Sequence, residues 1–186
     1  MSLPAHVTSL YSEADIQKSL GELAPRLDAW AEEAEAATGR LLMVVCMLRG
    51  GVFFFGDLLL HMKKSVEPGF CRAWSYAKDL NGQPEDTVRM DWQDLIVKDR
   101  DVVLVDNICD SGRTLAVASD WLGVWGARQV RTAVIVHRLR VDSRHAPTLV
   151  GFVYPGPEWL VGYGLRDSDS KLMNTRNIGF IPGTHH

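Results

Sequence analysis

Short apolar runs recur along this chain at intervals that leave room for helices between them. The run 41–48 (LLMVVCML) is typical of a strand covered on both faces, 101–106 (DVVLVD) predicts a second buried strand, and 130–136 predicts a third. Two further strands are predicted at 70–77 and 159–163. These runs are too short for buried helices of ordinary length, so they predict the strands of a sheet.

Helical spacing of apolar residues separates the predicted strands. The longest helix should begin after Ser12, a good N-cap with Asp15 three residues later as in a capping box, and should end near Gly39. Another is predicted at 52–62, which is apolar almost all round and is therefore expected to be mostly buried, and a third at 114–125. Strand, turn and helix in repetition predict an α/β fold with a mainly parallel central sheet flanked by helices. Ligands of such sheets bind beyond the carboxyl ends of the strands.

Composition narrows the class of protein. The 186 residues, 46 % of them apolar, suit one domain spanning 1–186. A net charge of −3 without a basic run argues against nucleic acid or an anionic membrane as partner. The start of the chain lacks the pattern of a signal peptide, and the longest apolar run falls far short of the ~20 residues that span a bilayer. Cys46, Cys71 and Cys109 have neither disulfide nor zinc-site spacing, so we expect a cytoplasmic protein.

The segment after the 101–106 strand has the residue types of an anion-binding turn. Asp106 and Asn107 end the strand, and Ser111, Gly112 and Thr114 stand where the next helix begins. The free N–H groups and the dipole of a helix N-terminus favour an anion, and a glycine lets the backbone approach it closely. An ordinary turn with N-capping residues uses the same types, so the spacing alone leaves both interpretations open.

The segment 102–115 (VVLVDNICDSGRTL) resembles the phosphoribosyl-pyrophosphate (PRPP) signature of the type I phosphoribosyltransferases. Three other segments are similar to the hypoxanthine-guanine branch of that family: 46–58 to its pyrophosphate loop and following helix, 75–76 to the start of its mobile loop, and 159–165 to its purine-stacking strand end. Order and spacing agree over about 12–181. The resemblance implies the type I phosphoribosyltransferase fold, with a small hood formed by the chain termini.

The resemblance also implies an activity. A 5-phosphoribosyl group would pass from PRPP to a purine base of the hypoxanthine or guanine type, giving a nucleoside monophosphate and pyrophosphate in purine salvage. PRPP and a nucleobase are then the expected partners, Mg²⁺ the expected cofactor, and a homo-oligomer, either dimer or tetramer, the expected assembly.

Roles for individual residues follow from the same resemblance. Asp110 lies at the position of the catalytic general base, near the purine N7, where a carboxylate can take the proton. Asp106 and Asn107 are assigned to the ribose hydroxyls. The remaining assignments are the 5′-phosphate to Ser111, Gly112, Arg113 and Thr114, pyrophosphate to Leu48, Arg49 and Gly50, the base to His137, Trp159 and Leu160, a lid loop to Ser75 and Tyr76, and the metal to Asp167.

Three positions depart from the family pattern. Asn107 replaces a carboxylate, and His137 stands where a lysine reads the purine 6-oxo group. Arg166 follows Leu165 where the family has a magnesium-binding aspartate, so Asp167 serves only if one residue is inserted. Two alternatives therefore stay open: a phosphoribosyltransferase for a different base, and a regulatory protein that binds PRPP or a nucleotide without turnover.

Overall fold

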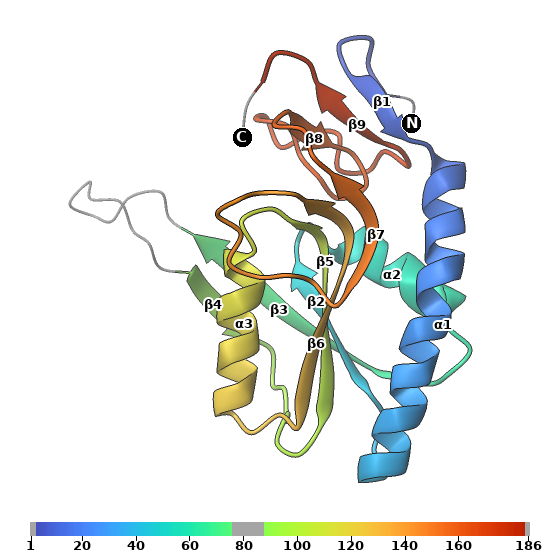
Figure 1. Ribbon diagram of the computed structural model, residues 1–186, viewed down its shortest axis with the longest axis vertical. Helices are drawn as coiled ribbons and strands as arrows, with labels where there is room; N and C mark the ends of the chain where they lie inside the picture. Colours follow the sequence, from blue (N-terminus) through green and yellow to red (C-terminus); the bar gives the residue numbers. More distant parts are fainter. Residues whose placement is uncertain (1–2, 76–87, 185–186) are drawn as a thin grey trace, which may run out of the picture.

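A six-stranded central sheet and a smaller three-stranded sheet make up the framework of the molecule (Figure 1). The computed structural model describes residues 3–75 and 88–184. The elements, in chain order, are β1 (Thr8–Tyr11), α1 (Glu13–Thr38), β2 (Met43–Leu48), α2 (Val52–His61), β3 (Glu67–Ser75), β4 (Val88–Trp92), β5 (Asp101–Cys109), α3 (Arg113–Val124), β6 (Gln129–Arg138), β7 (Leu149–Tyr154), β8 (Trp159–Val161) and β9 (Ile178–Ile181).

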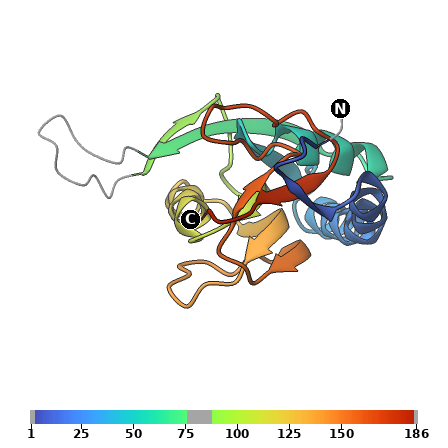
Figure 2. The same ribbon diagram turned by 90° about the horizontal axis from the view of Figure 1, so that it is seen from above.

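The central sheet confirms the predicted α/β architecture. Its strand order is β4-β3-β2-β5-β6-β7, with every neighbouring pair parallel except the antiparallel edge pair of β3 and β4. One core lies between the sheet and the helices α1 and α2, and a second lies between the sheet and α3. Figure 2 shows these helices on opposite sides of the sheet. Both faces are therefore covered, as the continuous apolar runs predicted.

The small sheet, in the order β1-β9-β8, forms a hood at the upper end of the molecule in Figure 1. The prediction that 159–163 belongs to the main sheet is wrong, because β8 pairs antiparallel with β9. The fifth parallel strand is β7, which pairs with β6 and was not predicted from the sequence pattern. The strands β1, β4 and β9 were also not predicted. Strand β5 runs three residues further than predicted, through Cys109, and so carries Asp106 and Asn107 within it.

Helix α1 begins and ends as its capping residues predicted. The Ser12 hydroxyl accepts from the Asp15 N–H, the Asp15 carboxylate accepts from the Ser12 N–H, and Gly39 ends the helix in the left-handed conformation at φ 67°. Helix α2 differs from expectation: Phe54, Phe55 and Leu58 are buried, but a second face is exposed. Val52, Phe53 and Leu60 on that face are exposed. The homo-oligomer remains a prediction.

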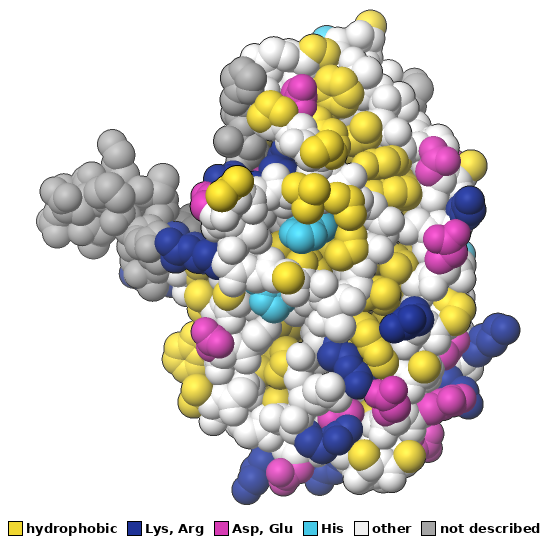
Figure 3. Space-filling model, in the orientation of Figure 1, with side chains coloured by type: hydrophobic (Ala, Val, Ile, Leu, Met, Phe, Trp, Pro, Cys, Tyr) yellow, Lys and Arg dark blue, Asp and Glu magenta, His cyan; other side chains and the backbone are white. Residues whose placement is uncertain are grey.

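The surface and the cysteines agree with the ordinary globular composition. On the face shown in Figure 3, basic and acidic side chains are interspersed rather than gathered into one basic surface. Cys46, Cys71 and Cys109 are all free and buried. Among the described residues, no helix combines the length and the apolar character needed to cross a bilayer.

Candidate active site

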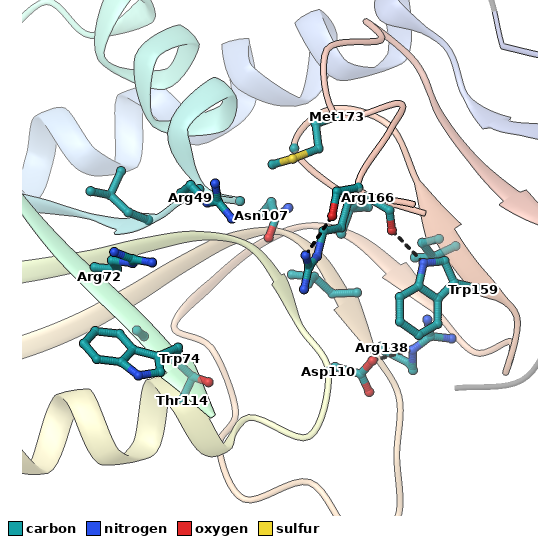
Figure 4. A pocket seen from close by; sticks show the side chains of 18 residues that line it. Arg49, Arg72, Trp74, Asn107, Asp110, Thr114, Arg138, Trp159, Arg166 and Met173 are labelled. Carbon is teal, nitrogen blue, oxygen red and sulfur yellow. Dashed lines mark hydrogen bonds and ion pairs between the residues drawn. The ribbon is translucent and has the colours of Figure 1, made fainter. Parts of the chain in front are cut away.

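A cavity of about 530 Å³ opens beyond the carboxyl ends of the parallel strands and under the hood. Its walls come from the turn after β2, the end of β5, the strand β3, and the hood segments around β8 and 164–173. Figure 4 shows these segments converging on one space. This is the edge of the sheet where ligands of parallel α/β folds bind.

The predicted phosphate turn forms a smaller adjoining cavity of about 190 Å³. Gly112 is the N-cap of α3 and has a φ of 72°, which a side chain rarely adopts. A Cβ on it would lie 2.7 Å from the backbone nitrogen of His145, so the turn is also packed too closely for one. The residues assigned to the 5′-phosphate all line this cavity: Ser111, Gly112, Arg113 and Thr114.

The predicted pyrophosphate turn forms part of the wall of the larger cavity. Leu48, Arg49 and Gly50 all line it, and the Leu48–Arg49 peptide bond is cis. A Cβ on Gly50 would lie 2.8 Å from the Asn107 side-chain nitrogen, and one on Gly164 would overlap the Gly50 carbonyl oxygen. The end of β5, the turn after β2 and the hood are therefore held together by contacts that only glycine permits.

Asp110 lies in the cavity between two arginines. Its Oδ2 accepts from Arg138 Nε at 3.2 Å and its Oδ1 accepts from Arg140 Nη1 at 3.1 Å. Arg138 is 3 % exposed, and its other nitrogens donate to the carbonyls of Gly156 and Glu158, just before β8. Arg138 thus ties the carboxylate to the segment that carries the predicted base platform.

The structure brings Arg138 to the cavity, and not His137. His137 lies near His145, whose pKa is lowered first by burial and then by His137. The predicted base contacts Trp159 and Leu160 do line the cavity, and Trp159 Nε1 donates to the Arg166 carbonyl at 2.7 Å.

The hood places Arg166 in the cavity and Asp167 outside it. Arg166 Nη1 donates to the Ser170 hydroxyl at 3.0 Å. The Asp167 carboxylate instead accepts the N–H groups of Asp169 and Lys171 within its own loop. Asp167 therefore stabilises a turn of the hood, and its assignment to the metal stays a prediction.

Strand β3 adds two cavity residues that the sequence analysis missed. Arg72 and Trp74 line the wall, with the Arg72 guanidinium 5.4 Å from the centre of the Trp74 ring. Alternation along the predicted strand places 72 and 74 on one face, which was the available signal. Of the predicted lid residues, Ser75 ends β3, and Tyr76 lies outside the described residues.

The donor set at the cavity does not fit a magnesium ion held by the protein. Magnesium prefers carboxylate and other oxygen ligands in octahedral geometry. Asp110 is bonded to two arginines, Asn107 supplies an amide, and Asp167 faces its own loop. In the part of the chain that the structure describes, no three Asp, Glu, His or Cys side chains gather at a possible metal site.

Burial raises the pKa of Asp106 from its ordinary 3.8 to about 7. The folded protein then binds this proton more tightly than the unfolded chain, so the stability from Asp106 is greatest below about pH 4 and is lost as the pH rises towards 7. We expect the free energy of unfolding of the wild type to fall relative to that of Asp106→Asn over this window. Denaturant unfolding of both proteins across about pH 4 to 8 measures the difference, and parallel curves would contradict it.

Comparison with known proteins identifies similar sequences and folds. A sequence profile described as "Phosphoribosyl transferase domain" matches residues 17–164. The hypoxanthine-guanine phosphoribosyltransferase of Streptococcus thermophilus is 29 % identical over 174 residues, covering 92 % of this chain and 91 % of that protein. The bifunctional protein TilS/HprT of Listeria innocua is 30 % identical over 177 residues, but this chain spans only 25 % of its length. The crystal structure of a hypoxanthine-guanine phosphoribosyltransferase from Bacillus anthracis superposes with a TM-score of 0.78 at 25 % identity, covering 97 % of this chain and 99 % of that one.

Proposed function

This chain belongs to the phosphoribosyltransferase family, and from that premise we propose that it transfers the 5-phosphoribosyl group of PRPP to a purine base of the hypoxanthine-guanine type. One observation carries the proposal. The phosphate turn at α3 lines the smaller cavity, the glycine turn after β2 and Trp159 line the adjoining larger one, and Asp110 lines both. Each of these groups matches one part of a PRPP–purine pair.

The proposed reaction needs one bond to break and one to form. The C1–O bond of PRPP breaks with its electron pair leaving on pyrophosphate, and a purine ring nitrogen bonds to C1. The proton on the purine passes to the Asp110 carboxylate, which also stabilises the positive charge that develops on the sugar. Arg138 and Arg140 hold both carboxylate oxygens in place for this step.

Binding is divided among the walls of the cavity. The N-terminus of α3 and the hydroxyls of Ser111 and Thr114 bind the 5′-phosphate, and Asp106 and Asn107 bind the ribose hydroxyls. Arg49 and the backbone of the adjoining glycine turn bind pyrophosphate. Trp159 stacks on the base, and the backbone of Leu160 recognises its edge.

Incubation of the protein with PRPP, Mg²⁺ and a panel of nucleobases tests the function. We expect nucleotide and pyrophosphate in equal amounts with hypoxanthine or guanine, measured by chromatography and a coupled pyrophosphate assay. Turnover with another base only would show a phosphoribosyltransferase for that base instead. Failure with every base, in a protein that binds PRPP measurably, would contradict an enzymatic role.

A regulatory protein that binds PRPP or a nucleotide is the second candidate. The specific observation in its favour is that both carboxylate oxygens of Asp110 accept hydrogen bonds from arginines. A carboxylate in two such bonds is less available to accept a proton as a general base. Asn107 also favours the regulatory protein, because the residues assigned to the ribose then include an amide in place of one carboxylate. The base panel decides between the two candidates, since only the enzyme releases pyrophosphate.

A further inference from the structure

Three arginines from separate parts of the chain face the larger cavity. Arg49 follows β2, Arg72 lies in β3, and Arg166 lies in the hood. In the view of Figure 4, Arg49 and Arg72 occupy the end of the cavity away from Trp159, and Arg166 lies between them and that platform. The three side chains therefore line one cavity, with Arg49 and Arg72 at the end assigned to the leaving group and Arg166 between that end and the base platform.

These arginines lack carboxylate partners among the described residues. Arg166 donates to the Ser170 hydroxyl, Arg72 packs over the Trp74 ring, and Arg49 is exposed to the cavity. The other arginines that reach this site differ, because Arg138 and Arg140 are both ion-paired with Asp110. Arginine keeps its charge at every physiological pH, so three such groups create a strong positive potential in the cavity. A bound polyanion is the group that such a potential favours.

The same wall is poor in the oxygen ligands that a protein-held metal would need. Asn107 supplies an amide, Arg166 supplies only hydrogen-bond donors, and the Asp167 carboxylate accepts from its own loop. A guanidinium carries a positive charge and five N–H donors, and it has no acceptor for a cation. The guanidinium N–H groups on this wall can donate directly to phosphate oxygens without a bridging cation.

We propose that Arg49, Arg72 and Arg166 bind a diphosphate group directly and take over the charge neutralisation that a protein-held Mg²⁺ would supply. The ligand is free pyrophosphate or the diphosphate on C1 of a sugar phosphate. Guanidinium groups bond phosphate oxygens in pairs, which suits the several oxygens of a diphosphate. The assignment of that diphosphate to PRPP rests on the proposed function, but the binding of pyrophosphate itself does not.

Calorimetric titration of the full chain with inorganic pyrophosphate, in EDTA and in Mg²⁺, tests the proposal. We expect the Kd in EDTA to be no more than about threefold weaker than in Mg²⁺. Arg166→Gln should weaken binding in EDTA by roughly tenfold or more, because a charge-assisted hydrogen bond is lost. Arg166→Asp should make binding depend on Mg²⁺.

Arg176→Gln is the matched control, because Arg176 also lies in the C-terminal segment but pairs with Glu13 and does not line the cavity. It should bind pyrophosphate like the wild type. Pyrophosphate binding that requires Mg²⁺ in the wild type, or that is unchanged in both Arg166→Gln and Arg72→Gln, would overturn the proposal. If Arg166→Gln fails to fold, two measurements still test the proposal: the pyrophosphate affinity of the wild type in EDTA against that in Mg²⁺, and the affinity of Arg72→Gln.

The experiments distinguish failure of the proposed function from failure of the arginine site. If pyrophosphate binds in EDTA but no base reacts with PRPP, the diphosphate site stands and the transferase does not. If hypoxanthine or guanine reacts but pyrophosphate binding requires Mg²⁺, the transferase stands and the arginine site does not.

Discussion

Asp110→Asn should lower kcat for nucleotide formation by about 10²- to 10⁴-fold, the range expected when a general base is removed. The amide has nearly the shape of the carboxylate but cannot take the proton from the purine nitrogen. PRPP binding should change by less than about threefold, because the groups assigned to its phosphates are untouched. Steady-state kinetics and calorimetric titration with PRPP measure the two quantities separately.

Asp142→Asn is the matched control for this substitution. Asp142 also bonds Arg140, at 2.8 Å from Nε, but its side chain is exposed and lies away from the cavity. Its turnover should stay near that of the wild type. Equal losses of kcat and PRPP affinity in Asp110→Asn would contradict the assigned role. Thermal unfolding of each variant separates these effects from a loss of folded protein, since Arg138 is buried against Asp110.

Gly164→Ala should destabilise the protein by about 2–5 kcal/mol, from backbone strain together with overpacking. Gly164 has a φ of 93°, and an added Cβ would overlap the carbonyl oxygen of Gly50. Relief of that overlap requires the hood to lift or the pyrophosphate turn to move. We therefore expect weaker PRPP binding as well, measured by titration alongside denaturant unfolding.

The control for this variant is Gly21→Ala in the middle of α1. A Cβ there meets nothing within 4 Å, and the residue is helical. Alanine should stabilise the helix by up to about 1 kcal/mol. If Gly164→Ala unfolds at the denaturant concentration of the wild type, the close contact between the hood and the turn after β2 is not essential.

Local chemistry explains which elements could be predicted. The caps of α1 and the apolar runs of β2, β5 and β6 are set by neighbours along the chain, and the structure confirms them. The edge strand β4 and the hood strands β1 and β9 could not be predicted in this way. These strands are only four or five residues long, and β1 and β9 pair with each other across most of the chain, so no clear apolar period marks them.

Some residues of the candidate site could likewise be predicted from the sequence, and others could not. The turns around Gly50 and Gly112 were identified by their resemblance to the family's pyrophosphate and PRPP segments, because their spacing alone also fits an ordinary capped turn. The sequence did not show whether His137 or Arg138 faces the cavity. Ile135 and its neighbour Val136 both pack in the core under α1 and α2, so strict alternation does not carry through to the end of β6.

The sequence by itself determined the α/β class, the apolar strands β2, β5 and β6 and the caps of α1, because each depends on residues close together in the chain. Only the tertiary structure decided that Arg138 holds Asp110, that Arg166 enters the cavity while Asp167 turns away, and that Arg72 joins them. Those outcomes depend on the twist at the end of a strand and on how the hood loop packs over a distant turn. Such long-range packing has no local pattern from which it could be predicted.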